Sequence, residues 1–88
     1  MESNGPIRVL LLLRYLLQNS DEAHPVSAGD ILRYWESSGV HSDRRRVYHD
    51  IALLQEFGVD IVCVKSRQNQ YFIGNRLFEL PELKLLVD

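Results

Sequence analysis

Three consecutive arginines, Arg44, Arg45 and Arg46, are the residues of this chain whose type and spacing point most directly to chemistry. A guanidinium group can form paired hydrogen bonds with a phosphate or with the edge of a guanine. The triplet opens an amphipathic stretch, where positive charges oppose the helix dipole, so helix stability does not explain it. A polyanionic partner explains the triplet, and the alternative interpretation is a solvated charge cluster.

The segment from Ser42 to Gly58 is predicted to be one helix that carries this triplet at its start. Ser42 is the expected N-cap, Asp43 suits the positive end of the dipole, and Gly58 is the expected stop. At about 100° per residue, apolar and polar side chains separate onto opposite faces. The apolar face consists of Val47, Ile51 and Leu54, and the outward face of Arg45, His49, Ala52 and Glu56, with Arg46 on the flank.

Two further helices are predicted before this one. The first runs from Pro6 to about Asn19. A polar loop and a very short strand at Pro25-Val26 follow, and Ser27 then caps the second helix in a capping box with Asp30. The inward faces of the two helices consist of Val9, Leu12, Leu13, Leu16 and Leu17, and of Ala28, Ile31, Leu32 and Trp35. A tight turn at Gly39 joins the second helix to the arginine-bearing helix, which is the spacing of a helix-turn-helix.

After Gly58 the pattern becomes extended. Residues 60–64 and 71–73 are β-branched and aromatic runs on either side of a polar stretch, residues 65–70, which predicts a β-hairpin with a basic tip. Lys65, Arg67 and Arg76 are the charged residues of 61–78, so positive charge is concentrated there and in the arginine triplet. Lys65 and Arg67 would contact phosphates or the minor groove, although hairpin loops are polar by default.

The run from Ser42 to Ile61, above all Val47-Tyr48-x-Asp50-Ile51 with Phe57-Gly58, resembles the recognition helix and following strand of bacterial DeoR-type winged-helix regulators that carry a C-terminal WYL domain. The ending, residues 74–88, is similar to their join with the effector part. The resemblance implies an α+β winged helix-turn-helix, built as a three-helix bundle plus a hairpin wing with the start of a C-terminal linker helix. It places residues 1–78 in the DNA-binding domain and residues 79–88 in the linker to a missing effector domain.

The resemblance implies sequence-specific binding of double-stranded DNA, with helix 43–57 in the major groove and wing 65–70 on the backbone or minor groove. The expected DNA-binding residues are Arg44, Arg45, Arg46, Tyr48, His49, Lys65 and Arg67. Two departures are notable. His49 stands where relatives usually have arginine, and an unperturbed histidine is mostly uncharged near neutral pH. Gln68, Asn69 and Gln70 stand where the wing tip is usually glycine-rich.

The last residues indicate a fragment of a longer regulator. Pro81 is expected to start a helix that reaches Asp88 after about two turns and that packs on Ile7 and Leu11 or on a second copy. The resemblance implies a homodimer of the full-length protein, and an effector ligand only for the missing domain.

The sequence offers little support for other classes of function. The net charge is −2, and Cys63 is the single cysteine, which excludes an internal disulfide and fits a reducing, cytoplasmic setting. His41 and His49 are too far apart along the chain to share a metal, and no glycine-rich phosphate loop or tuned carboxylate pair is found. We therefore expect no enzyme, no cofactor, no metal and no membrane span. The alternative is a winged helix used for protein contact, which the near-neutral charge allows.

Overall fold

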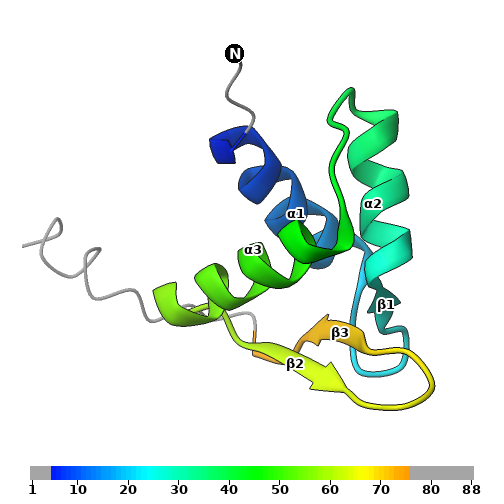
Figure 1. Cartoon of the computed structure of the whole chain (residues 1–88). Coiled ribbons are helices and arrows are strands. Elements are labelled where there is room, and N and C mark those ends of the chain that lie inside the picture. Colours follow the sequence, from blue (N-terminus) through cyan, green and yellow to red (C-terminus); the bar gives the residue numbers. More distant parts are fainter. Residues whose placement is uncertain (1–4, 76–88) are drawn as a thin grey trace, which may run out of the picture.

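The computed structural model describes residues 5–75, which form three helices and a three-stranded antiparallel sheet. The chain order is α1 (Gly5–Asn19), β1 (Val26–Ser27), α2 (Ala28–Ser37), α3 (Arg44–Phe57), β2 (Ile61–Val64) and β3 (Gln70–Ile73). Figure 1 shows the three helices on one side of the small sheet. The structure confirms the predicted α+β class. The predicted linker helix at 79–88 and the predicted domain end at residue 78 lie outside the described residues.

The sheet has the order β1-β3-β2, so β3 is the central strand. The short first strand lies one residue later than the predicted Pro25-Val26, and its Ser27 pairs with Gln70. Gln70 also pairs with Val64 of β2, so the prediction that it belongs to the hairpin loop is wrong. Its backbone is held on both sides, because the central strand offers hydrogen-bonding groups to two neighbours.

The cap predicted for the second helix is confirmed. Oγ of Ser27 accepts a hydrogen bond from the Asp30 N–H at 3.1 Å, and Oδ2 of Asp30 accepts one from the Ser27 N–H at 3.0 Å. These reciprocal bonds satisfy two donors that a helix start leaves unpaired. The helix ends at Ser37, two residues before the predicted turn at Gly39.

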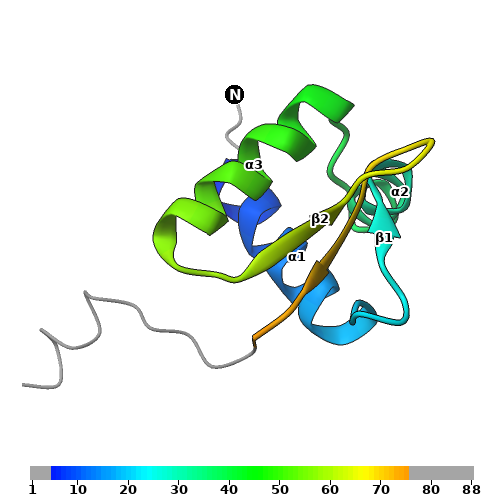
Figure 2. The same cartoon turned by 90° about the horizontal axis from the view of Figure 1, so that it is seen from below.

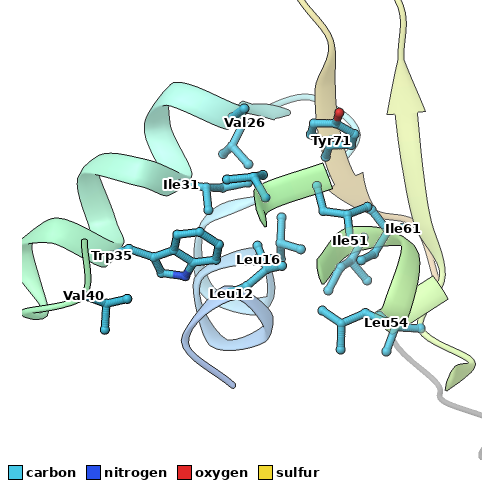
Figure 3. Packing of buried hydrophobic residues seen from close by; sticks show 14 residues of the cluster. Leu12, Leu16, Val26, Ile31, Trp35, Val40, Ile51, Leu54, Ile61 and Tyr71 are labelled. Atoms are coloured by element: carbon cyan, nitrogen blue, oxygen red, sulfur yellow. The ribbon is translucent and has the colours of Figure 1, made fainter. Parts of the chain in front are cut away.

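The core lies between the three helices and the inner face of the sheet (Figure 3). Trp35, Leu12, Leu16 and Ile31 are fully buried, as their helical spacing predicted. Leu32 and Cys63 are only half-buried, at the margin of this core. Core packing explains why a chain of this size can order three short helices, since apolar burial is the main favourable term.

Two polar side chains fasten the sheet to the helices. The buried hydroxyl of Ser20, just after α1, donates to the Leu16 carbonyl at 2.7 Å and accepts from the Ile73 N–H of β3 at 3.2 Å. Nε2 of Gln55 in α3 donates to the Ile61 carbonyl of β2 at 2.7 Å. In Figures 1 and 2 the N-terminal end of α3 and the tip of the β2–β3 hairpin lie toward the same side of the molecule. No helix within residues 5–75 has the length and apolar character that crossing a membrane requires.

Candidate nucleic-acid interface

Asp43, and not the predicted Ser42, is the N-cap of α3. Its backbone is extended, with φ −135°, and its Oδ1 accepts a hydrogen bond from the Arg46 N–H at 3.0 Å. Both residue types cap helices well, but aspartate adds a negative charge next to the positive end of the dipole and to the arginines. At the other end Gly58 has φ 118°, in the left-handed region that favours glycine, so the predicted stop is confirmed.

The three arginines that follow this cap are exposed and point to different neighbours. Arg45 and Arg46 line a shallow hollow of about 280 Å³ together with Asp43 and His49. Arg44 lies over the start of α2, because its Nη2 would be 3.7 Å from a Cβ added at Gly29. None of the three forms an ion pair with a carboxylate of residues 5–75. Their positive charge is therefore free to meet an anion from solution.

Arg33 is a cation of this region that the sequence did not single out. Its Nη1 would be 3.8 Å from the same added Cβ at Gly29, so its guanidinium and that of Arg44 both lie over the first turn of α2. Arg33 also forms an exposed ion pair with Asp30 in the i,i+3 arrangement. That spacing alone indicates an intrahelical pair, and only the fold brings Arg33 next to Arg44.

Tyr48 of α3 faces the hollow between this helix and the hairpin. Its side chain is 44% exposed, and with Ala52 and Gln55 it lines a hollow of about 370 Å³ between the helix and the hairpin. The hairpin contributes Cys63, Asn69 and Tyr71 to this hollow. Burial raises the pKa of the Tyr71 hydroxyl, so it stays protonated at neutral pH. The hollow is thus a neutral polar surface beside the arginines.

His49 is held by a buried carboxylate. Its Nδ1 lies 3.1 Å from Oδ1 of Asp50, a side chain with no exposed surface. The other partner of Asp50 is Arg8 of α1, whose Nε donates to Oδ2 at 2.6 Å and whose Nη2 donates to Oδ1 at 3.2 Å. Hydrogen bonding to Asp50 is the main cause that raises the pKa of Arg8, which stays charged. Sequence reasoning missed Arg8 as a partner, because residues 42 positions apart show no periodic signal.

Lys65 and Arg67 are exposed at the hairpin tip, as predicted. The tip is organised by Ser66, whose Oγ donates to the Gln68 carbonyl at 3.0 Å, without the glycines of a usual wing. Within the described ranges no carboxylate pairs with either cation. The predicted site residues thus form two clusters on the same side of the molecule, one at the start of α3 and one at the tip (Figures 1 and 2).

The part of the chain that the structure describes contains no group of three histidine, cysteine or acidic side chains that could hold a metal ion. The site offers the cations at the start of α3 and at the hairpin tip, side-chain amides, and the phenols of Tyr48 and Tyr71. Such groups bind anions and hydrogen-bonding edges. Comparisons with protein-family models, with curated proteins and with solved structures found no match. The resemblance to DeoR-type regulators therefore stays a prediction.

Proposed function

We propose that this chain is a sequence-specific DNA-binding module of the winged helix-turn-helix type. The observation that carries the proposal is the unpaired arginine triplet at the start of α3. Like charges there oppose the helix dipole and form no ion pair with the carboxylates of residues 5–75. A polyphosphate backbone offsets that cost and rewards clustered arginine.

The arrangement of the elements supports this proposal. In helix-turn-helix proteins the N-terminal residues of the second helix of the motif reach base edges in the major groove. Here α3 follows α2 after a short turn and exposes its arginines at its N-terminal end, and Glu56 stands on the C-terminal half of its outward face. We assign the major groove to the first two turns of α3 and the backbone or minor groove to the hairpin as a wing.

The residues take different roles in this proposal. Arg45 and Arg46, beside His49 in one hollow, are placed to contact base edges. Arg44 lies with Arg33 over the start of α2, and two cations at a helix N-terminus suit a phosphate. Tyr48 suits a hydrogen bond to the backbone, and Lys65 and Arg67 supply phosphate or minor-groove contacts from the tip.

The resemblance to DeoR-type regulators extends the proposal to a longer protein. In that proposal the module works in a cytoplasmic homodimer on a two-fold operator, and a WYL-like domain senses an effector. The second candidate function is protein contact without DNA. The net charge of −2 favours that candidate, because binding to nucleic acid usually goes with a basic domain.

The Arg45→Ala variant tests the proposal. If the Arg45 contact is bidentate, the variant should lose roughly 1–3 kcal/mol at the best site and relax base preference there. Arg14→Ala is the matched control, because it removes the same charge from the exposed side of α1. Fluorescence anisotropy against a selected duplex library gives both readouts. Equal affinity and preference for Arg45→Ala and Arg14→Ala would contradict the assignment and favour the protein-contact candidate.

A further inference from the structure

An apolar groove lies between α1 and α3, and the DNA-binding proposal does not use it. It has a volume of about 440 Å³, and we call it the α1/α3 groove. Its main walls are Val9, Leu10, Leu13, Leu53, Phe57 and Val59. Leu10 is 65% exposed, Leu53 45% and Phe57 49%, so these side chains stand largely in solvent. Water contact with such a continuous apolar surface is costly, which indicates that something covers it.

The described chain ends beside this groove. The Gly74 N–H donates to the Asp60 carbonyl at 2.9 Å, and the Asn75 N–H donates to Oδ2 of Asp60 at 2.8 Å. Asp60 directly follows Val59 of the groove wall. The approach is close, since a Cβ at Gly74 would lie 2.7 Å from Oδ2 of Asp60 and the Asp60 side chain would have to move to accommodate it. The exit of the chain is therefore fixed one residue from the groove.

The residues that follow carry an apolar face of matching size. If residues 81–88 form a helix that begins at Pro81, Leu83, Leu86 and Val87 fall on one face at i, i+3 and i+4. Leu85 falls on the opposite face. The charged residues of the expected helix, Glu82, Lys84 and Asp88, lie outside this apolar face. The match between this segment and the groove thus rests on their apolar faces.

We propose that residues 81–88 of this chain dock as a two-turn helix in the α1/α3 groove of the same molecule. Residues 76–80 can span up to about 17 Å when extended, which is ample for an exit adjacent to the groove. A two-turn helix is about 12 Å long, comparable to the short groove walls on α1 and α3. The docked helix would lay its apolar face between two packed helices, a common mode of helix recognition.

The tether favours this segment over a second copy of the chain. A short linker gives its two ends a millimolar effective concentration, so weak apolar contact suffices for docking. A stable dimer usually buries about 1,600 Å² in total, which is far more than a groove of this size offers by itself. The sequence predicted that this segment packs on Ile7 and Leu11 or on a second copy. The proposed contact is a different one, because Leu11 packs against the core and neither residue lines the groove.

Methyl NOEs in the full 88-residue chain test the proposal. We expect NOEs from Leu83 and Leu86 to Leu10 and Leu53, unchanged on dilution and absent between differently labelled copies in an isotope-filtered experiment. A folded chain without these NOEs would overturn the proposal. NOEs found only between copies would also overturn it and would assign the groove to a dimer.

Two matched variants give a second readout. Leu83→Asp should shift the amide signals of Leu10, Leu53 and Phe57, because a charge on the docking face expels the helix. Leu85→Asp places the same charge on the opposite face and should leave those signals in place. Equal shifts from both variants, or none from Leu83→Asp, would contradict docking. Neither residue belongs to the DNA-binding surface, so DNA affinity and docking can fail independently.

Discussion

Asp50 shows how one buried charge can order a surface helix. The carboxylate has no exposed surface, and its bonds to Arg8 fasten α1 to α3 while its contact with His49 orients a residue of the proposed DNA-binding surface. Burying a carboxylate is costly unless it is paired and hydrogen-bonded, and here it is both. A packing role of this kind also accounts for an aspartate in the middle of a helix, where its intrinsic propensity is low.

The Asp50→Ala variant should therefore be destabilised by about 3 kcal/mol, because removal of one partner leaves the other charge uncompensated. The Arg8 side chain keeps 12% of its surface exposed, so it can be partly rehydrated, which favours the lower end of the usual range. Urea unfolding followed by circular dichroism measures the change. Glu56→Ala, at an exposed position of the same helix, is the control and should stay within about 0.5 kcal/mol. Equal stability of the two variants would show that the pair is unimportant.

Asp21 supplies a test of pH dependence at the loop between α1 and β1. The side-chain hydrogen bond with His24, at 3.0 Å, is the main cause that lowers the pKa of Asp21 below its ordinary value of 3.8. A lowered folded-state pKa contributes stability above the unfolded value, and this contribution is lost as the pH falls through the folded-state pKa. Asp21→Asn should thus lower the free energy of unfolding at pH 5 and have a vanishing effect as the solution becomes more acidic.

Carbon-detected NMR titration of the Asp21 carboxyl measures the same effect directly. We expect a midpoint below 3.8 in the wild-type chain and a higher midpoint in His24→Ala, where two backbone N–H donors, of Ala23 and His24, still lower it. A wild-type midpoint at or above 3.8 would contradict the hydrogen bond seen here.

At the scale of the elements, the cap of α3 sets where the arginines begin. Asp43→Ala should cost about 1 kcal/mol of stability, because the Arg46 N–H loses its acceptor and the arginines lose their nearest counter-charge. Ser42→Ala should be near neutral, because the residue at 42 is not the cap. Thermal unfolding of the two variants in parallel gives the comparison. A larger loss of stability for Ser42→Ala than for Asp43→Ala would contradict this assignment and favour Ser42 as the N-cap.

Most of the elements could be read from the sequence. Helical spacing of apolar residues and the Ser27–Asp30 box predicted α1 and α2, and β-branched runs predicted the hairpin, because these signals are local. The cap at Asp43 was missed since Ser42 is an equally good capping residue, and only the chain path decides between neighbours. The sequence did not predict that Gln70 belongs to a strand, because a polar residue gives no local strand signal. Its place in the sheet follows from its pairing with Ser27 and Val64.

The candidate site was predictable in its composition but not in its geometry. The charge pattern identified the arginines and the hairpin cations, and all of them are exposed. The position of Arg44 beside Arg33, and the support of His49 by Asp50 and Arg8, come from contacts between elements that no periodicity reveals. Long-range polar pairs of this kind depend on how the helices pack.

On the scale of the whole molecule, charge and apolar surface are separated. Exposed cations that form no ion pair within residues 5–75 occupy the start of α3 and the hairpin tip, whereas the α1/α3 groove includes the C-terminal half of α3. In the two proposals, α3 therefore serves two surfaces, with its arginines binding an anion and its last turns contacting an apolar segment. A molecule with a net charge of −2 can in this way present a local basic face, and steering by such a face depends strongly on salt.

If the start of α3 and the hairpin tip bind DNA together, an NMR titration of the 88-residue chain with a mixed-sequence duplex at low salt will detect both surfaces at once. We expect amide shifts clustered on residues 44–49 and 65–69, reversed by added salt as counterion release requires, with the amide signals of the groove residues Leu10 and Phe57 unchanged. A folded chain whose amides at 44–49 and 65–69 stay unmoved by DNA would contradict the DNA-binding proposal.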